Sequence, residues 1–471
     1  MKTYIKTYFT LFLTILSLFF SLIFNDLQAQ MFPTPPQKVP VLTQPSTIKT
    51  NAISILNSTY DEVNPNISPD GKYLFFMSKR GGMTWSATRD AANGGGFDGD
   101  IWFSQKINGN WSAPASLGAT VNTFDGEDEP NISPDGQTVA YQSWKDWSTR
   151  SGPYYKAALQ GTYWGTPQPL GGGIHQFFMN EDVKGVSQAT DGMAISPDGN
   201  TFIVALGDYV KNMDLYISFR VGGVWSYLTK LNISTPYNER APFIAADGKT
   251  LYFASNGYTS AGGLDIFKGT LNANGTVTDV VNIGAPFNTA QNDQGFILTA
   301  DGKEAYFVRN GDIYYADITN SPKIMKPKST LIIEGVVTSK RTKKPINAEI
   351  VFKADKTNKI IASNAYTGKY VLVLEKTDLK QLNQAIKKVG YTPYMKAITV
   401  TNDDNSEKIT LNIELEDSEE SIKQREEIAK KKEDLLKKQR EEIKKREDLK
   451  TGKTLVQQKY ARREAMAEYP R

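Results

Sequence analysis

The chain has 471 residues, enough for two or three domains, and its net charge of +4 at pH 7 is small for this length. Acidic and basic residues are interspersed, so the charge does not favour a nucleic-acid partner. Cysteine is absent, which excludes disulfides, thiolate metal sites, a thiol nucleophile and a lipid-modified cysteine. The single histidine, His175, excludes the common multi-histidine metal sites.

The N-terminus has the features of an export signal. Early lysines precede an almost wholly apolar stretch, Thr7 to Phe24, and Leu27-Gln-Ala29 offers a small residue for cleavage. We predict a cleaved signal peptide over residues 1–29, followed by a proline-rich spacer over 30–49. The alternative is an uncleaved anchor, because Tyr8–Phe24 is just long enough to approach a bilayer span.

A short phrase recurs along the next part of the chain. NISPDGKYLFFMS at 66–78 is followed by NISPDGQTVAYQS at 131–143, and three looser versions come after them. The turn aspartates of the five copies are Asp70, Asp135, Asp198, Asp247 and Asp301. Pro, Asp and Gly suit a tight turn, and the apolar run behind them suits a short strand. Recurrence at near-fixed spacing indicates a repeat architecture.

Each unit contains further strands. An aspartate precedes a second apolar run in Gly99-Asp-Ile-Trp-Phe103, and the same pattern recurs in three later units, at Asp214, Asp265 and Asp312. Units of three or four short strands, stacked radially, form a β-propeller. We therefore predict a five-bladed propeller over residues 50–320, with a degenerate sixth blade left open.

The last unit lacks its closing strand after Tyr315. Near the other end of the chain, Ala52-Ile-Ser-Ile-Leu-Asn-Ser-Thr-Tyr60 is similar to Leu117-Gly-Ala-Thr-Val-Asn-Thr-Phe124. We predict that residues near 50–58 supply the outer strand of the final blade, which would leave no open sheet edge in the ring.

The composition and the strand pattern change after the predicted propeller. A linker rich in Pro and Lys covers residues 321–329, and spaced strand patterns over 330–416 favour a small β-sandwich. Within it, Leu379 to Lys388 is predicted to form a short helix. Residues 417–471 form a charged helical tail with recurring Glu-to-Lys pairs and a capping box begun by Asp417. Its apolar residues are too sparse for a strong coiled coil, which leaves a solvated helix or a docking helix.

Two segments resemble known families. STPYNERAPFIAADGKTLYFASNGYTSAGGLDIF (234–267) resembles the PD40 repeat of TolB-like, WD40-like propellers, and residues 335–374 resemble a carboxypeptidase-regulatory-like, transthyretin-like domain. The pairing is similar to PorE-type periplasmic proteins of the Bacteroidota type IX secretion system. That resemblance implies a periplasmic setting, peripheral to the outer membrane, and protein partners from a secretion or gliding assembly. The chain departs from it by ending in the charged helix instead of an OmpA-like domain, so peptidoglycan binding does not carry over.

Acidic residues recur just before the first strand of each unit. They are Asp61, Glu62, Asp125, Glu127, Asp191, Glu239 and Asp293. Equivalent positions of a propeller lie near one mouth of the central channel, so these carboxylates are candidates for binding a cation or a basic peptide. The alternative is that each accepts backbone hydrogen bonds that tie neighbouring blades together.

No motif assembles a catalytic site. No Gly-x-Ser-x-Gly elbow accompanies His175, which is interpreted as a loop residue, and Gly452-Lys-Thr454 lacks the glycine of a phosphate loop. The acidic stretches Gly94–Asp100 and Phe124–Glu129 could hold a hard cation through oxygen ligands, but they lack full calcium-loop spacing, so we interpret them as tight acidic turns. We predict a non-enzymatic scaffold or adaptor without cofactor, metal, nucleic-acid partner or direct lipid anchor. The alternatives are a module that binds a small ligand (peptide, glycan or cation) at the acid-lined channel and, third, an enzyme.

Overall fold

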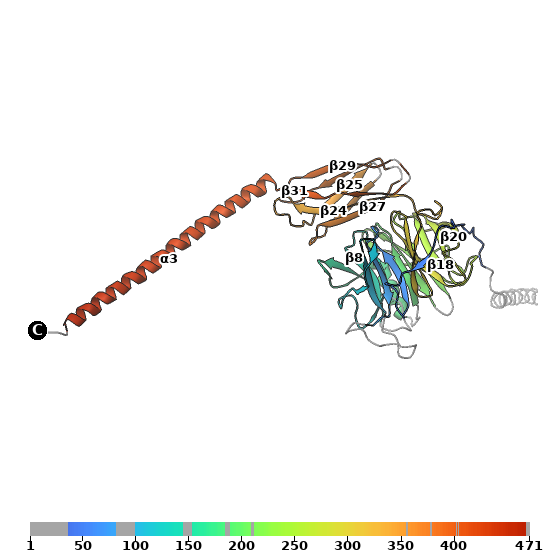
Figure 1. The fold of residues 1–471 in the computed structure, drawn as a ribbon, viewed down its shortest axis with the longest axis horizontal. Coiled ribbons are helices and arrows are strands. Elements are labelled where there is room, and N and C mark those ends of the chain that lie inside the picture. Colours follow the sequence, from blue (N-terminus) through green and yellow to red (C-terminus); the bar gives the residue numbers. More distant parts are fainter. Residues whose placement is uncertain are drawn as a thin grey trace, which may run out of the picture.

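The computed structural model describes residues 36–81, 99–144, 153–183, 189–208, 212–354, 357–376, 379–401, 403 and 405–467. They form a propeller, a sandwich beside it and a long helix that leaves the sandwich on the side away from the propeller (Figure 1). The predicted signal peptide, 1–29, and most of the acidic stretch Gly94–Asp100 lie outside these residues.

Five antiparallel sheets make the propeller blades, numbered here in chain order. Blade 1 is β2 (Glu62–Ile67), β3 (Tyr73–Ser78), β4 (Asp100–Ile107), β5 (Asn110–Trp111) and β6 (Ala115–Ser116). Blade 2 is β7 (Gly126–Ile132), β8 (Thr138–Trp144), β9 (Tyr154–Gln160), β10 (Tyr163–Trp164) and β11 (Gln168–Pro169). Blade 3 is β12 (Ala189–Ile195), β13 (Thr201–Gly207), β14 (Met213–Val221), β15 (Val224–Trp225) and β16 (Thr229–Lys230).

The remaining two blades have four strands each. Blade 4 is β17 (Glu239–Ile244), β18 (Thr250–Ser255), β19 (Asp265–Leu271) and β20 (Val277–Asn282). Blade 5 is β21 (Asp293–Leu298), β22 (Glu304–Arg309), β23 (Asp312–Asp317) and β1 (Asn51–Ala52). The inner strands β2, β7, β12, β17 and β21 contact one another in a cycle. The predicted propeller is therefore confirmed, and the described residues close the ring with five blades.

The ring is closed by the N-terminal part of the described chain, as predicted. β1 pairs with β23 through Asn51 opposite Tyr315 and Ala52 opposite Tyr314. Asn57 reinforces the closure, because its side chain exchanges two hydrogen bonds with the backbone of Ile313, at 2.8 and 3.2 Å. Asn122 makes the same pair of bonds to Ile101 within blade 1.

The proline-rich segment that precedes β1 lies against blade 4. Gln37 N donates to Gly257 O, and Leu42 N donates to Asn282 O, both at 2.9 Å. Gln44 Nε2 donates to Ile283 O at 2.9 Å. From residue 37 onward the predicted spacer is thus bound to the propeller.

The Asp-Gly turns join the two innermost strands of every blade and lie on one side of the ring, named here the turn face. In each turn the glycine has a positive φ between 65° and 72°, a conformation that only glycine adopts without strain. In four turns a Ser or Thr hydroxyl donates to the turn aspartate, and one of these is Ser68 Oγ to Asp70 at 2.6 Å.

The sandwich consists of two sheets around its own apolar core. The first sheet orders β27 (Lys369–Glu375), β24 (Thr330–Ser339), β30 (Glu407–Thr410) and β31 (Ile413–Leu415), with β24 in the middle. The second orders β26 (Thr357–Ala362), β25 (Glu349–Ala354), β28 (Gln381–Ile386) and β29 (Tyr394–Thr399). The helix predicted over Leu379–Lys388 is wrong: β28 pairs on both sides, and its side chains alternate between exposed and covered positions.

His175 lies in helix α2 (Gly172–Val183) and not in a loop, so that prediction is also wrong. The helix packs on β15, and a Cβ at Gly173 would overlap the backbone of Ser226. The glycine run therefore permits a close approach between a helix and a blade.

The charged tail is helix α3 (Glu419–Ala467), and its side chains from residue 426 to 466 are all exposed. Ser418 caps it, since its Oγ accepts from Ser421 N at 3.3 Å. Asp417, which was predicted to begin a capping box, instead lies just before the cap and pairs with Arg341 and Arg425. Among the residues that the structure describes, no helix is long and apolar enough to cross a membrane.

Candidate functional site

The recurring acids begin the inner strands, and four of them share one hydrogen-bonding arrangement, named here the strand-start clamp. A Ser or Thr four residues earlier donates both its backbone N–H and its hydroxyl to the carboxylate. The four pairs are Ser58–Glu62, Thr123–Glu127, Thr235–Glu239 and Thr289–Asp293, at 2.6 to 2.9 Å. The clamp fixes the loop that enters each of these four blades. This agrees with the alternative that the acids have a structural role in the repeat.

The clamps differ in what neutralises the carboxylate. Glu62 pairs with Arg80 at 2.8 Å, and Asp293 pairs with Arg309 at 2.6 Å. Glu127 and Glu239 accept hydrogen bonds from Ser143 and Ser255, as Glu62 does from Ser78, but they form no ion pair with another described residue. Burial therefore raises the pKa of Glu127 to about 8 and that of Glu239 to about 7, against the opposing hydrogen bonds from Thr123 and Thr235.

The third blade departs from the predicted acid pattern. Asp191 is not a strand-start acid: it lies one residue further along, and Thr190 occupies the position that Glu62 has in blade 1. Asp191 instead pairs with Arg240 of blade 4 at 3.0 Å. Asp61 is exposed and lies beside Gly311, and Asp125 is partly exposed on a loop. The seven acids thus do not form one ring, and a binding role for them stays a prediction.

The centre of the propeller is nearly closed. All five inner strands carry a β-bulge whose residue has a positive φ: Asn64, Glu129, Gly192, Ala241 and Gly295. These bulges and their neighbours surround a space of about 10 Å³ on the axis. That volume suits about one water molecule, so the inner strands leave no channel for a peptide or a glycan at this level.

Glu129 is a buried acid that the sequence analysis missed. Its Oε2 accepts from the hydroxyl of Tyr154 at 2.5 Å. Burial first, and then the neighbouring Asp128 carboxylate, raise the pKa of Glu129 to about 8. The acid does not recur in the repeat, since blade 1 has Asn64 at the same position. The only signal in the sequence was that Glu129 precedes Pro130, as Asn64 precedes Pro65.

The sandwich sits on the turn face and touches the rims of all five blades. The contacts are Lys72–Glu334 at 3.1 Å, Gln137–Asn364, Asp198–Lys359 at 3.9 Å, Lys249–Glu375 and Ala300 O–Thr330 Oγ1 at 2.7 Å. Blade 4 adds a contact to the linker. Its turn has Ala245 where other blades have Ser or Thr, and Asp247 Oδ2 accepts from Lys328 N at 2.8 Å. Contacts on every side hold the sandwich over the propeller axis.

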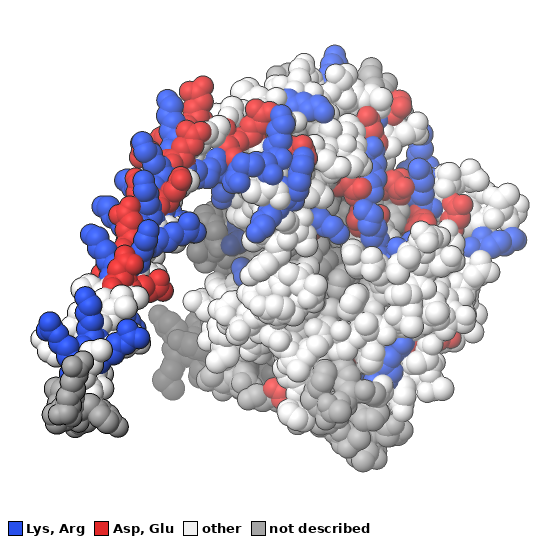
Figure 2. Space-filling model, turned by 60° about the vertical axis from the view of Figure 1, so that its left-hand side comes forward, with Lys and Arg blue, Asp and Glu red and all other residues white. Residues whose placement is uncertain are grey.

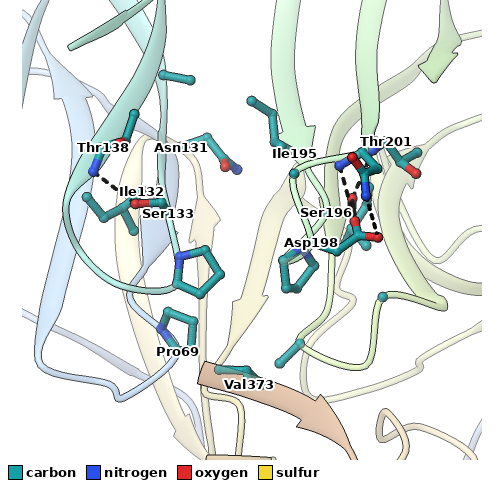
Figure 3. A pocket seen from close by; sticks show the side chains of 18 of the residues that line it. Pro69, Asn131, Ile132, Ser133, Thr138, Ile195, Ser196, Asp198, Thr201 and Val373 are labelled. Carbon is teal, nitrogen blue, oxygen red and sulfur yellow. Dashed lines mark hydrogen bonds between the residues drawn. The ribbon is translucent and has the colours of Figure 1, made fainter. Parts of the chain in front are cut away.

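A cavity of about 1400 Å³ lies between the turn face and the sandwich. The turns of blades 1 to 4 line one side of it, and β26 and β27 line the other. In Figure 3, Pro69 of one turn and Val373 of β27 lie at its base, with the turn of Asp198 opposite that of Ser133. This cavity is larger than the roughly 300–1000 Å³ of most small-molecule pockets and is the principal candidate site.

The described residues contain no group of three side chains that could hold a metal ion. The acidic stretch Phe124–Glu129 uses its carboxylates separately, with Glu127 in a clamp and Glu129 bound to Tyr154. His175 is a half-buried residue of α2, whose Phe177 and Phe178 belong to an aromatic cluster.

Comparison with known proteins gives structural likeness alone. No family model matches the chain, and no curated protein matches it. Among solved structures, a putative TolB from Agrobacterium tumefaciens is 16% identical with a TM-score of 0.33, covering 71% of this chain and 99% of that one. TolB from Acinetobacter baumannii is 14% identical, with a TM-score of 0.32 and 57% of each chain covered. The periplasmic gluconolactonase PpgL of Pseudomonas aeruginosa is 12% identical, with a TM-score of 0.30, covering 73% of this chain and 86% of that one.

Proposed function

We propose that the chain is an exported, non-enzymatic adaptor of the cell envelope, whose propeller–sandwich body presents α3 to a protein partner. One observation carries this proposal: α3 is 49 residues long, about 74 Å at the usual rise, and among the described residues only its first turns contact the body. Beyond those turns, from residue 426 to 466, every side chain of α3 is exposed, and such a surface can bind another protein.

The C-terminal part of α3 has the chemistry of a docking element. Leu449, Val456 and Tyr460 are exposed, and their spacing of seven and four residues places them on one side of the helix. Residues 449–467 carry five basic side chains against one acidic side chain. Figure 2 shows basic side chains predominating toward that end, whereas both signs alternate nearer the body. The partner we propose is a protein with an apolar groove bordered by acidic residues.

The cellular setting rests on the sequence. The apolar N-terminal stretch supports export, and the resemblance to PorE-type proteins supports a periplasmic place near the outer membrane, beside a type IX secretion or gliding assembly. Without a cysteine to acylate, attachment to the membrane would come from the partner.

The test is chemical cross-linking of the native protein in envelope fractions, followed by mass spectrometry. We expect reproducible cross-links from lysines of 449–467 to one envelope protein. Val456→Asp should abolish them, whereas Leu436→Asp, an exposed leucine of α3 outside the stripe, should leave them in place. Equal cross-linking of both variants, or a free monomer without partners, would overturn the proposal.

A further inference from the structure

The cavity between propeller and sandwich contains an unpaired strand edge. β27 pairs with β24 on one side only, because it is the outermost strand of its sheet. Its residues 371–375 line the cavity. We propose that an extended, acidic peptide segment of a partner protein binds in this cavity by adding a strand to the free edge of β27.

The hydrogen-bond register shows which backbone groups are free. Lys376 N donates to Ser329 O at 2.7 Å, and Val337 N donates to Gly368 O at 2.9 Å. In an antiparallel pair such bonds recur at every second residue, so Tyr370, Leu372 and Leu374 direct their backbone groups toward β24. The intervening residues Val371, Val373 and Glu375 direct theirs to the opposite side, where no described strand is hydrogen-bonded to β27.

Those groups favour a polypeptide over another kind of ligand. N–H and C=O groups at alternating positions along an edge match the spacing of a second extended chain. Edge strands open to solvent invite uncontrolled pairing, and natural proteins usually cover them. Here the turn face stands over the edge while leaving about 1400 Å³ beside it, so a single strand can enter without sheet growth.

The walls supply apolar contacts for alternate side chains. The side chains of Leu372 and Leu374 are in the sandwich core, so those of Val371 and Val373 face the other way, toward the propeller. Across the cavity lie the turn prolines, among them Pro69, which is labelled with Val373 in Figure 3. An added strand would place every second side chain between these surfaces.

The charge of the walls favours acidic side chains in the peptide. Every carboxylate that lines the cavity is already engaged: Asp135 and Asp198 within their turns, Asp247 by Thr250 and Lys328, and Glu375 by Lys249. By contrast, Lys156 and Arg220 on the wall form no ion pair with a described carboxylate. Arg220 donates to Gly223 O and lies over the Trp225 ring. These two cations remain available for acidic residues of the peptide.

The experiment selects ligands for the mature, full-length chain from a phage-displayed library of random peptides of roughly ten residues, about 33 Å when extended. We expect enrichment of acidic sequences with alternating apolar residues. The selected peptides are then synthesised, and their affinity is measured by fluorescence polarisation. Methylation of every second backbone nitrogen on the edge-facing side should lower affinity about tenfold or more, because it removes the donors of strand addition.

Two variants and two controls locate the site. Val373→Pro removes a backbone donor that β24 does not use, and we expect about a tenfold loss of affinity with unchanged thermal unfolding. The control Ile360→Pro changes the free edge of β26 on the same cavity and should bind normally. Lys156→Glu with Arg220→Glu should weaken acidic peptides and favour basic ones. Val456→Asp on α3 should change nothing, which separates this proposal from the docking helix.

Other outcomes would overturn the proposal. Failure to enrich peptides on the wild type over Val373→Pro would exclude strand addition at β27. If methylated and unmethylated peptides bound with equal affinity, the binding would come from side-chain contacts and not from strand addition. A loss confined to Ile360→Pro would assign the strand to β26 instead.

Discussion

The propeller and α3 differ in where their stability comes from. Every inner strand of the propeller is largely buried, and four of the five carry at their start a carboxylate that is clamped by hydrogen bonds. α3 buries almost nothing and relies on a serine cap, helix-forming residues and charge pairs such as Arg446–Glu442. The body therefore folds around its own core, whereas α3 leaves nearly all its side chains exposed.

The largest contrast should appear on truncating an apolar side chain. Phe307 is fully buried and packs on Phe287 and Tyr314, with ring centroids 5.8 and 5.6 Å away. Phe307→Ala should lower the free energy of unfolding by about 3–5 kcal/mol. Leu435→Ala on α3, where the leucine is exposed, should change it by less than about 0.5 kcal/mol. Chemical denaturation of both variants measures the difference, and equal effects would contradict the contrast.

The pH dependence of stability should also come from the body. Because the pKa values of Glu127 and Glu239 are raised in the folded chain, the folded state holds more protons than the unfolded state above the ordinary pKa of 4.5. Stability should therefore fall as pH rises from 4.5 to about 8, by at most about 1.4 kcal/mol per pH unit for each group. Glu127→Gln should flatten this slope, and truncation after Ser418 should leave it unchanged. Denaturation curves across the range would refute the prediction if stability rose with pH.

Ring closure offers a contrast within the body. Asn57→Ala and Asn122→Ala each remove two hydrogen bonds to a backbone, at about 1–3 kcal/mol. Only Asn57 joins the two ends of the propeller, so its loss should also speed hydrogen exchange in β23. If Asn122→Ala exposed β23 equally, closure would not depend on Asn57.

The smallest effect should follow removal of the helix cap. Ser418→Ala should destabilise the first turns of α3 by about 1 kcal/mol, because Ser421 N loses its acceptor. Circular dichroism at 222 nm should show fraying, while the near-ultraviolet signal of the body stays constant. A change in that signal would indicate that α3 supports the body after all.

Repetition made the propeller predictable from one sequence. Five copies of a turn phrase predicted five blades, with a sixth left open, and the likeness between residues near 57 and 122 predicted the closing strand. Counting from the turns would also have corrected the acid pattern: the strand-start residue lies eight positions before each turn aspartate, which in blade 3 is Thr190 and not Asp191.

Features outside the repeat were harder to predict. β28 contains Leu, Gln and Ala, which favour helices, and its inward Gln384 conceals the alternation of a strand. The cavity depends on how two domains meet, through pairs such as Lys72–Glu334 that are 262 residues apart. No local pattern in the sequence records such a contact.

The pairing of β1 with β23 has a consequence for the order of events during biogenesis. The two strands are separated by some 260 residues, and bringing such distant segments together is slow. A chain that emerges N-terminus first, from a ribosome or across a membrane, presents β1 long before β23 exists outside. Blades 1 to 4 must therefore persist as an open arc, and the ring is completed only after residue 317 has emerged.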